Sequence, residues 1–365
     1  MIRKLFVFIL SVSMLLTTSL CGCSKLGGYA KGSWTVALYL CGSNLETKQG
    51  WASKTLTELL EADLPDNVNF VIQTGGCSKW RSDYVTAGDN KRLLVREDDF
   101  KDIGAGEFDS MGEAKALADF LAFCAKEYPA ERTAVILWNH GGGPIKGACF
   151  DETANFDTLT LDELSYALAS GVKANNGRKY DIIGFDACLM ASIETAVTVS
   201  GYGNYMVASE EIESGAGWDY SPIIKAMGDK LGTEEVAKTF CDGYMKKCES
   251  KGKSAAATLS VVDLAKTDAV ADALCSAVDA TVGSFDDSTK ALRSIAFRTN
   301  TAEAFGGSTK GEGSSNLIDL YGMAKANSDD SVNGSYWKPL MDAIDDAVLY
   351  SVHGAAASGA NGISV

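Results

Sequence analysis

Histidine is scarce in this sequence, which has only two among 365 residues. The sequence contains no Cys-x-x-Cys pair and no cluster of cysteines and histidines at zinc-ligand spacing, so we expect no structural metal site. Proline is also scarce, with five residues, and the absence of a long low-complexity tract argues against disorder. Basic residues number 33 against 48 acidic ones, for a formal charge of −15. This charge disfavours nucleic-acid backbones and anionic membrane surfaces as partners, and leaves open a basic substrate or simple solubility.

The N-terminal stretch, residues 1–23, has the pattern of a secretory signal. Two basic residues precede an apolar run that is too short for a stable membrane span. The run ends in Leu20-Cys-Gly-Cys23, which resembles a bacterial lipoprotein signal, in which the cysteine is acylated and becomes the new N-terminus. We therefore expect an exported protein anchored to the outside of a bacterial cell membrane through a lipid on Cys23, with residues 24–31 as a tether. Cleavage without a lipid is the alternative.

The ten cysteines are an even set, which in an exported protein suggests disulfides. Cys41, Cys124 and Cys275 nevertheless lie inside apolar strand or helix patterns, where a free cysteine is an ordinary small core residue. The disulfide state therefore stays open.

Apolar runs that suit buried strands alternate with amphipathic segments over most of the chain. This alternation predicts βαβ units and a parallel sheet. We expect an α/β fold with a catalytic domain over 32–252 and a mostly helical C-terminal subdomain over 253–365, truncated if its apolar end, 361–365, is a cut strand. The predicted strands are 34–41, 69–73, 133–138, 181–186, 205–209 and 257–262, and the predicted helices are 55–61, 111–127, 160–169, 189–199, 219–228, 233–250, 266–283, 316–326 and 337–351.

Three local signals complete this prediction. Gly88-Asp-Asn90 between 82–86 and 91–96 indicates a hairpin. Ser110 and Glu113 are placed for a capping box at the start of the helix predicted over 111–127. The Gly/Ser-rich stretch 304–315 indicates a surface loop.

Two residues that can perform nucleophilic chemistry follow neighbouring predicted strands. His140 comes directly after the strand 133–138, and Cys188 after the strand 181–186. The carboxyl ends of parallel strands meet at one edge of a sheet, so we expect a thiol–imidazole dyad there. The helix predicted to follow Cys188 would lower the pKa of its thiol. Taken singly, a buried cysteine and a capped loop histidine would be the simpler interpretations.

The residues around this pair suggest further roles. The backbone N–H groups of Gly141 and Cys188 are candidates for an oxyanion hole. Asp186 lies two residues before Cys188 and should point the same way along the strand, so it is a candidate to bind a substrate guanidinium or ammonium group; capping of the next helix is the alternative. Glu210 and Glu211 follow the next strand and either line the same pocket or are solvated surface residues.

One competing motif needs comment. His140-Gly-Gly-Gly143 also resembles the oxyanion loop of lipases and esterases. That interpretation requires a Gly-x-Ser-x-Gly elbow downstream, and the sequence has none.

At these residues the chain resembles the clostripain family of cysteine peptidases. The motifs that carry the resemblance are Leu137-Trp-Asn-His-Gly-Gly-Gly143, Leu159-Thr-Leu-Asp-Glu-Leu164, Asp186-Ala-Cys-Leu-Met190, Ser209-Glu-Glu211 and Gly217-Trp-Asp-Tyr220. The resemblance implies a caspase-like fold, a three-layer α/β/α sandwich with a mostly parallel central sheet. It also implies that His140 and Cys188 form the catalytic dyad and that Asp186 helps to set a preference for Arg or Lys before the scissile bond.

The resemblance implies two further properties of some family members. One is activation by self-cleavage between the two catalytic motifs, for which Lys146 is the candidate site. The other is a need for calcium, for which Asp151, Glu152 and Asp157 could supply oxygen ligands, with ordinary surface acids as the alternative. The sequence therefore predicts a cysteine endopeptidase that cuts proteins or peptides after Arg or Lys. The alternative function is a non-catalytic surface lipoprotein that uses the same fold as a binding module.

Overall fold

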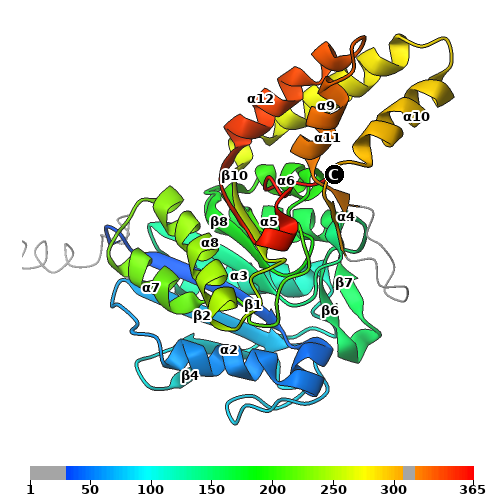
Figure 1. The fold of residues 1–365 in the computed structure, drawn as a ribbon. Coiled ribbons are helices and arrows are strands. Elements are labelled where there is room, and N and C mark those ends of the chain that lie inside the picture. Colours follow the sequence, from blue (N-terminus) through cyan, green and yellow to red (C-terminus); the bar gives the residue numbers. More distant parts are fainter. Residues whose placement is uncertain (1–29, 307–316) are drawn as a thin grey trace, which may run out of the picture. The chain divides into compact units, whose positions relative to one another are not determined.

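In the computed structural model, which describes residues 30–306 and 317–365, nine strands form one central β-sheet (Figure 1). These strands are β1 (Trp34–Cys41), β2 (Val68–Gly75), β3 (Lys91–Val95), β4 (Phe100–Ala105), β5 (Arg132–Trp138), β8 (Tyr180–Asp186), β9 (Gly203–Ala208), β10 (Thr258–Asp263) and β13 (Val348–His353). The sheet order is β13-β10-β9-β8-β5-β1-β2-β3-β4. The five central strands, from β9 to β2, pair in parallel, and the outer strands pair antiparallel on both sides.

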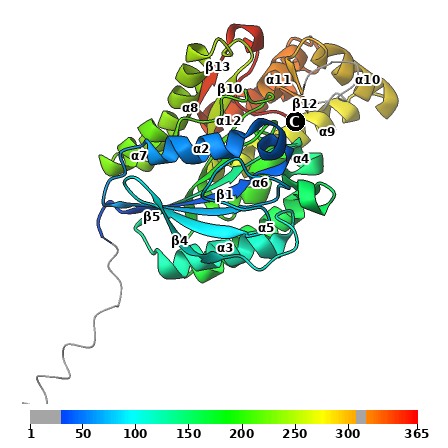
Figure 2. The ribbon, with the colours of Figure 1, turned by 90° about the horizontal axis from the view of Figure 1, so that it is seen from below.

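Helices cover both faces of the sheet, which confirms the predicted three-layer α/β/α arrangement (Figure 2). One face is covered by α2 (Trp51–Leu60), α7 (Tyr220–Gly228) and α8 (Thr233–Ser250). The other face is covered by α3 (Ala114–Glu127), α5 (Leu161–Ala174), α6 (Ile193–Ser200), α9 (Thr267–Gly283) and α12 (Lys338–Ala347). The remaining elements include α4 (Gly143–Lys146), α10 (Ser288–Thr299), α11 (Leu320–Ser328), β6 (Ala148–Asp151), β7 (Asp157–Leu159), β11 (Ala304–Phe305) and β12 (Leu317–Ile318).

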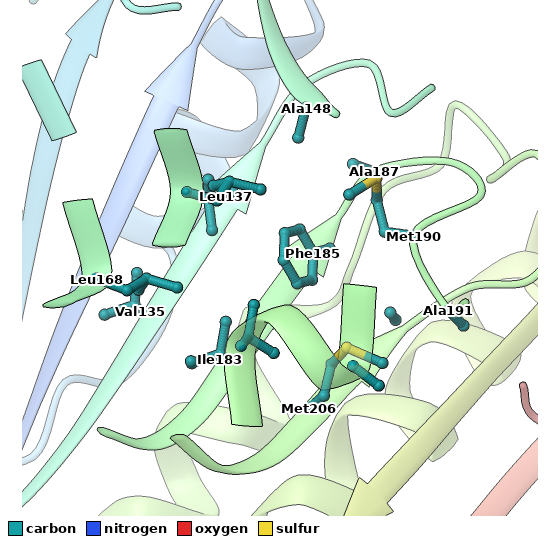
Figure 3. Packing of buried hydrophobic residues seen from close by; sticks show 14 of the residues in the cluster. Val135, Leu137, Ala148, Leu168, Ile183, Phe185, Ala187, Met190, Ala191 and Met206 are labelled. Atoms are coloured by element: carbon teal, nitrogen blue, oxygen red, sulfur yellow. The ribbon is translucent and has the colours of Figure 1, made fainter. Parts of the chain in front are cut away.

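The central strands read as continuous apolar runs because both of their faces are buried. Val135 and Leu137 of β5 lie on the same side of the sheet as Ile183 and Phe185 of β8 (Figure 3). The residues between them, such as Ile136, pack in the core on the opposite face. Truncating a fully buried side chain of this size, such as Phe185, to alanine costs about 3–5 kcal/mol of stability. The packing therefore fixes the register of β5 against β8, and with it the relative positions of whatever follows these strands.

The C-terminal part contributes strands to the central sheet as well as helices. The helix predicted over 337–351 is wrong in its second half, because α12 ends at Ala347 and β13 pairs antiparallel with β10. The sequence of β13, Val-Leu-Tyr-Ser-Val-His, is rich in β-branched and aromatic residues that favour a strand. Residues 32–365 form one compact unit, and the predicted boundary between 252 and 253 stays a prediction.

Two local predictions near the N-terminal half are also wrong. β3 pairs with β4, so the hairpin is formed by 91–95 and 100–105 and does not include 82–86. Ser110 and Glu113 do not form a capping box, because Ser110 Oγ accepts a hydrogen bond from Gly112 N and donates one to Asp157 Oδ2. The capping box was predicted wrongly because a serine hydroxyl can form hydrogen bonds with loop groups as well as with the free N–H groups at a helix start.

The end of the chain packs against the loop that follows β8. Ser364 N donates to Ala191 O over 2.8 Å, and Ile193 N donates to Ser364 O over 2.9 Å. Gly362 N donates to a carboxylate oxygen of Glu210 over 2.7 Å. Residues 362–364 therefore support the segment between Cys188 and α6 from outside the sheet.

Some predictions lie outside the described residues. These are the signal segment 1–23 with the lipidation site Cys23, most of the tether 24–31, and 307–316 within the Gly/Ser-rich loop. The eight cysteines within the described residues are free thiols, and Cys275 is exposed, contrary to its predicted place in the core. Among the described residues, no helix combines the length and the apolar character needed to cross a membrane.

Candidate active site

The structure brings His140 and Cys188 together at the carboxyl edge of the sheet. β5 and β8 are parallel neighbours in which Trp138 is paired with Asp186, so His140 and Cys188 each lie two residues beyond the last pair. Both side chains line one pocket of about 260 Å³, together with Asp186. The arrangement of these three residues follows from the shared register of the two strands.

The loop that carries Cys188 differs from the prediction. α6 begins at Ile193, where Ser192 caps it by accepting a hydrogen bond from Thr195 N, so Cys188 is not at a helix N-terminus. Leu189 has a φ of 64°, a left-handed conformation that is costly for a side chain of this size. Such strain persists where surrounding contacts hold the backbone, and here Ala191 N donates to Ser209 O over 2.9 Å. The loop therefore presents Cys188 in a fixed, strained turn.

The Cys188 thiol is protonated in this environment. Burial raises the pKa of Cys188, while hydrogen bonds from the backbone N–H groups of Glu213 and Gly141 act in the opposite direction. The Glu213 N–H donates to Cys188 Sγ over 3.2 Å. The predicted lowering of this pKa by a helix N-terminus is wrong, because the helix starts five residues later.

His140 is held in its neutral form. Burial lowers the pKa of its imidazole, and the ring packs edge-on against Phe150 with 5.9 Å between centroids. Nε2 of His140 lies 2.7 Å from Oδ1 of Asn44, which leaves Nδ1 as the nitrogen available to another partner. A neutral imidazole next to a protonated thiol is suited to general-base catalysis, in which the proton moves as the sulfur attacks.

Gly141 has no room for a side chain. A Cβ atom at this position would lie 2.0 Å from the carbonyl oxygen of Cys188. Because Gly141 has no side chain, its backbone approaches Cys188 closely enough for its N–H to form a hydrogen bond with the sulfur. A backbone N–H beside the nucleophile can stabilise an oxyanion formed there.

Two carboxyl groups, the buried Asp186 and the half-buried Glu213, lie in the same pocket. Asp186 Oδ2 accepts a hydrogen bond from the Tyr220 hydroxyl over 2.8 Å, and Glu213 Oε1 accepts one from Trp218 Nε1 over 3.2 Å. Burial raises the pKa of Asp186 to about 6, and burial together with the charge of Asp186 raises the pKa of Glu213 well above its usual range. Mutual repulsion therefore disfavours the state in which both carboxyl groups are ionised.

The remaining charged groups of the pocket compensate one another. Glu58 contacts Lys247 at 2.8 Å and Lys54 at 3.5 Å, so its charge is already paired. Tyr220 and Trp218 donate to Asp186 and Glu213 as neutral groups, and no ion pair joins either carboxyl group to a lysine or arginine among the described residues. Apolar atoms of Leu45, Trp51 and Ile212 complete the walls.

Glu210 and Glu211 do not line this pocket. The Glu210 side chain is fully buried and accepts a hydrogen bond from Gly362 N, and burial raises its pKa well above the usual range. Glu211 Oε1 accepts from Gly306 N over 3.0 Å and from Ile212 N over 2.7 Å. Both carboxylates contact the C-terminal part of the chain, so their substrate-binding role stays a prediction that this pocket does not support.

The carboxylates proposed as calcium ligands are engaged separately. Asp151 accepts from Met111 N and Thr153 N, Glu152 accepts from the Thr47 hydroxyl, and Asp157 accepts from the Ser110 hydroxyl. Among the described residues, no group of three or more His, Cys, Asp or Glu side chains is arranged to hold a metal ion. This set of three residues does not fit a calcium site.

Sequence reasoning missed Asn44 and Glu213. Asn44 lies three residues after the buried strand β1, at the same sheet edge as His140, and this position was the available signal. Glu213 lies between the motif segments 209–211 and 217–220, in a stretch whose path could not be predicted. Both residues reach the site from loops, whereas His140, Asp186 and Cys188 follow the ends of strands.

Several known proteins are similar to this chain in sequence or in fold. A family model described as "Clostripain family" matches residues 38–364. Clostripain from Hathewaya histolytica is 30% identical over 140 residues, which are 33% of this chain and 26% of that protein, so the match spans about a quarter of the relative. A secreted C11 cysteine protease from Bacteroides thetaiotaomicron, solved with an irreversible peptide inhibitor, has a TM-score of 0.68 at 19% identity over 91% of each chain. An inactive zymogen C11 protease from Parabacteroides distasonis has a TM-score of 0.65 at 20% identity, over 90% of this chain and 85% of that one.

Proposed function

The chain belongs to the clostripain family of cysteine peptidases, and from this premise we propose that it is an endopeptidase that cuts after Arg or Lys. The observation that carries the proposal is the pocket beside Cys188, which contains His140 and the carboxyl groups of Asp186 and Glu213. A nucleophile, a base and a buried negative charge in one pocket are what cleavage after a basic residue requires.

We assign the chemical steps to the dyad. The Cys188 sulfur attacks the scissile carbonyl carbon, and a carbon–sulfur bond forms while His140 accepts the thiol proton. The same proton then passes from His140 to the leaving amine, the C–N bond breaks, and a thioester remains on Cys188. Water attacks the thioester with His140 as the base, which releases the acid product and returns the proton to sulfur. The N–H groups of Gly141 and Cys188 stabilise the oxyanion in both steps.

Substrate preference is assigned to the two acids. The guanidinium or ammonium of the substrate enters the pocket beside Cys188 and meets the Asp186 carboxylate, which gains a partner of opposite charge at little cost in desolvation because the group is already buried. Glu213 lies near enough to accept a second hydrogen bond once its proton is released. This arrangement supports Asp186 as the main determinant and adds Glu213.

We further propose that the protein acts outside the cell, anchored through a lipid on Cys23. The support is the signal-like pattern of residues 1–23 and its Leu20-Cys-Gly-Cys23 ending. Mass spectrometry of the membrane fraction would detect a diacylglyceryl group on Cys23, and Cys23→Ala should release the protein into the medium.

Lys146 remains our proposed site of self-cleavage. Its side chain is exposed at the end of α4, where Gly147 N donates to Gly143 O over 2.9 Å. Cleavage at Lys146 therefore requires this turn to open. We expect Lys146→Ala to keep the chain in one piece during incubation, whereas the parent chain splits into two fragments, the second beginning at Gly147 by N-terminal sequencing. Identical fragments from the variant would contradict the site.

The experiment that tests the function is covalent labelling. An acyloxymethyl ketone carrying Arg is expected to label Cys188, as mapped by mass spectrometry, and the same reagent carrying Asp should label it at least about 100-fold more slowly, because a buried carboxylate repels an acid. Cys275 serves as an internal control, because it is exposed and lies outside the pocket.

Two alternatives are separated by the same experiment. A binding module with a blocked cleft would give no label on Cys188 with either reagent. An esterase would be labelled on a serine by a serine-directed phosphonate and not on Cys188.

A further inference from the structure

Asn44 contacts the catalytic histidine from the loop that follows β1, a third strand of the sheet beside β5 and β8. Its Oδ1 lies 2.7 Å from Nε2 of His140, although the two residues are 96 positions apart in the sequence. Asn44 follows β1, which is the parallel neighbour of β5. The contact therefore joins the ends of two adjacent strands at the site.

The loop that carries Asn44 is fixed by its own hydrogen bonds. Gly42 N donates to Gly75 O over 2.9 Å and Ser43 N donates to Gly76 O over 3.0 Å, which ties the loop to the end of β2. Asn139 Nδ2 donates to Cys41 O over 2.6 Å, which ties the same loop to the residue before His140. The amide of Asn44 therefore faces His140 from a preorganised position.

We infer that Asn44 is a positioning residue that selects the tautomer of His140. The amide oxygen accepts a hydrogen bond from the N–H at Nε2, so Nδ1 carries the lone pair and is the nitrogen that removes the thiol proton of Cys188. The same contact stabilises the imidazolium that forms after proton transfer. The inference rests on the proposed function and adds a third member to its dyad.

The choice of an amide at this position has a chemical consequence. A carboxylate in place of the amide would favour the charged imidazolium and raise the pKa of His140, whereas burial lowers that pKa here. The neutral amide orients the ring without charging it. Changes at position 44 should therefore move the protonation of the dyad in a direction set by the charge of the new side chain.

Two variants and one control test the inference. Asn44→Ala removes the hydrogen-bond acceptor of His140. The nearly isosteric Asn44→Asp keeps an acceptor oxygen, replaces the amide NH2 by a second oxygen and adds a negative charge. Gln49→Ala is the control, because Gln49 is exposed in the short helix η1 (Leu45–Gln49) that follows Asn44 and does not line the pocket. Turnover of an Arg peptide gives kcat and KM, and iodoacetamide alkylation of Cys188, mapped by mass spectrometry from pH 5 to 9, reports the thiolate without any substrate.

We expect Asn44→Ala to lower kcat by about 10- to 100-fold with KM changed less than twofold, as for other partners that orient a functional histidine. Its alkylation profile should shift to higher pH, because the imidazolium that stabilises the thiolate has lost its partner. Asn44→Asp should retain more activity than Asn44→Ala and shift the alkylation profile to lower pH. Gln49→Ala should match the parent chain in both measurements.

The outcomes separate the inference from the function on which it rests. Alkylation profiles of both variants that coincide with the parent profile overturn the role of Asn44. Opposite shifts in the two variants support it even if the parent chain cleaves no basic peptide, in which case the proposed function fails alone. Should Asn44→Ala fail to fold, the Asn44→Asp profile decides, because an unshifted profile there overturns the role.

Discussion

Replacement of Cys188 by alanine is expected to abolish cleavage of peptides that contain Arg or Lys, with kcat/KM reduced by a factor of about 10⁴ or more. The reason is that Cys188 is the one cysteine among the described residues that lines the pocket with His140, whereas Cys149, whose N–H donates to His140 O, is fully buried. The pocket itself keeps its shape, since β5 and β8 set it. Hydrolysis of a fluorogenic Arg peptide measures the loss.

The matched control for this variant is Cys275→Ala. Cys275 is exposed on α9 and does not line the pocket, so this variant should retain full activity. Thermal unfolding of both variants shows whether the loss in Cys188→Ala is chemical or structural. Residual cleavage above a tenth of the parent rate would rule out Cys188 as the nucleophile.

The second large effect is expected from the acids of the pocket. Asp186→Asn should reduce kcat/KM for Arg and Lys peptides by about 10²- to 10³-fold, because the variant offers a neutral amide to a buried cation. The rate at which iodoacetamide alkylates Cys188 should change less than about threefold, since Asp186 acts on the substrate. Glu213→Gln should show a smaller loss of the same kind, because Glu213 carries the shared proton.

Binding of an Arg peptide should weaken at low pH, because the carboxylate that binds the cation becomes protonated. Burial raises the pKa of Asp186 to about 6, so its carboxyl group is mostly neutral below that pH and mostly charged above it. We expect KM for an Arg peptide to rise as pH falls through about 6 in the parent chain. The same pH change should raise KM less in Asp186→Asn, because Glu213 is then the one acid of the pair that remains.

Asp181→Asn is the control for Asp186. Asp181 lies at the other end of β8, where its carboxylate accepts a hydrogen bond from Thr133 N over 2.9 Å. This variant also replaces a partly buried carboxylate on the same strand, but outside the pocket, so it should lose stability without changing substrate preference. If Asp186→Asn loses alkylation rate and peptide cleavage equally, Asp186 is structural, and its contact with Tyr220 is its main function.

The sequence predicted the parts of the site that depend on strand pattern. β5 and β8 are apolar runs that end sharply, so the place of His140 and Cys188 at neighbouring strand ends could be predicted from the strand pattern, whereas the register came from the structure. The prediction failed where polar side chains and backbone groups had more than one possible hydrogen-bond partner. The helix after Cys188 starts at Ile193 because Ser192 caps it and a strained turn at Leu189 intervenes, and neither feature has a periodic signal.

In the C-terminal half, too, elements with a local pattern were predicted, whereas elements that depend on contacts distant in sequence were not. The helical period through 338–347 was correctly recognised, but the change to a strand at Val348 depends on pairing with β10, a contact distant in sequence. The position of Glu210 outside the pocket has a related reason. Its partner, the N–H of Gly362, comes from a segment more than 150 residues away, and no local pattern could reveal it.

The support that residues 362–364 give to the loop after Cys188 bears on the order of events during synthesis. Ribosomes release a chain from its N-terminus onward, so the dyad and its three strands emerge well before Ser364. Until Ser364 arrives, the carbonyl of Ala191 and the amide of Ile193 lack their partners, and the nucleophile turn is unbraced. The turn that carries Cys188 therefore gains its full set of backbone hydrogen bonds only after Ser364 has been synthesised.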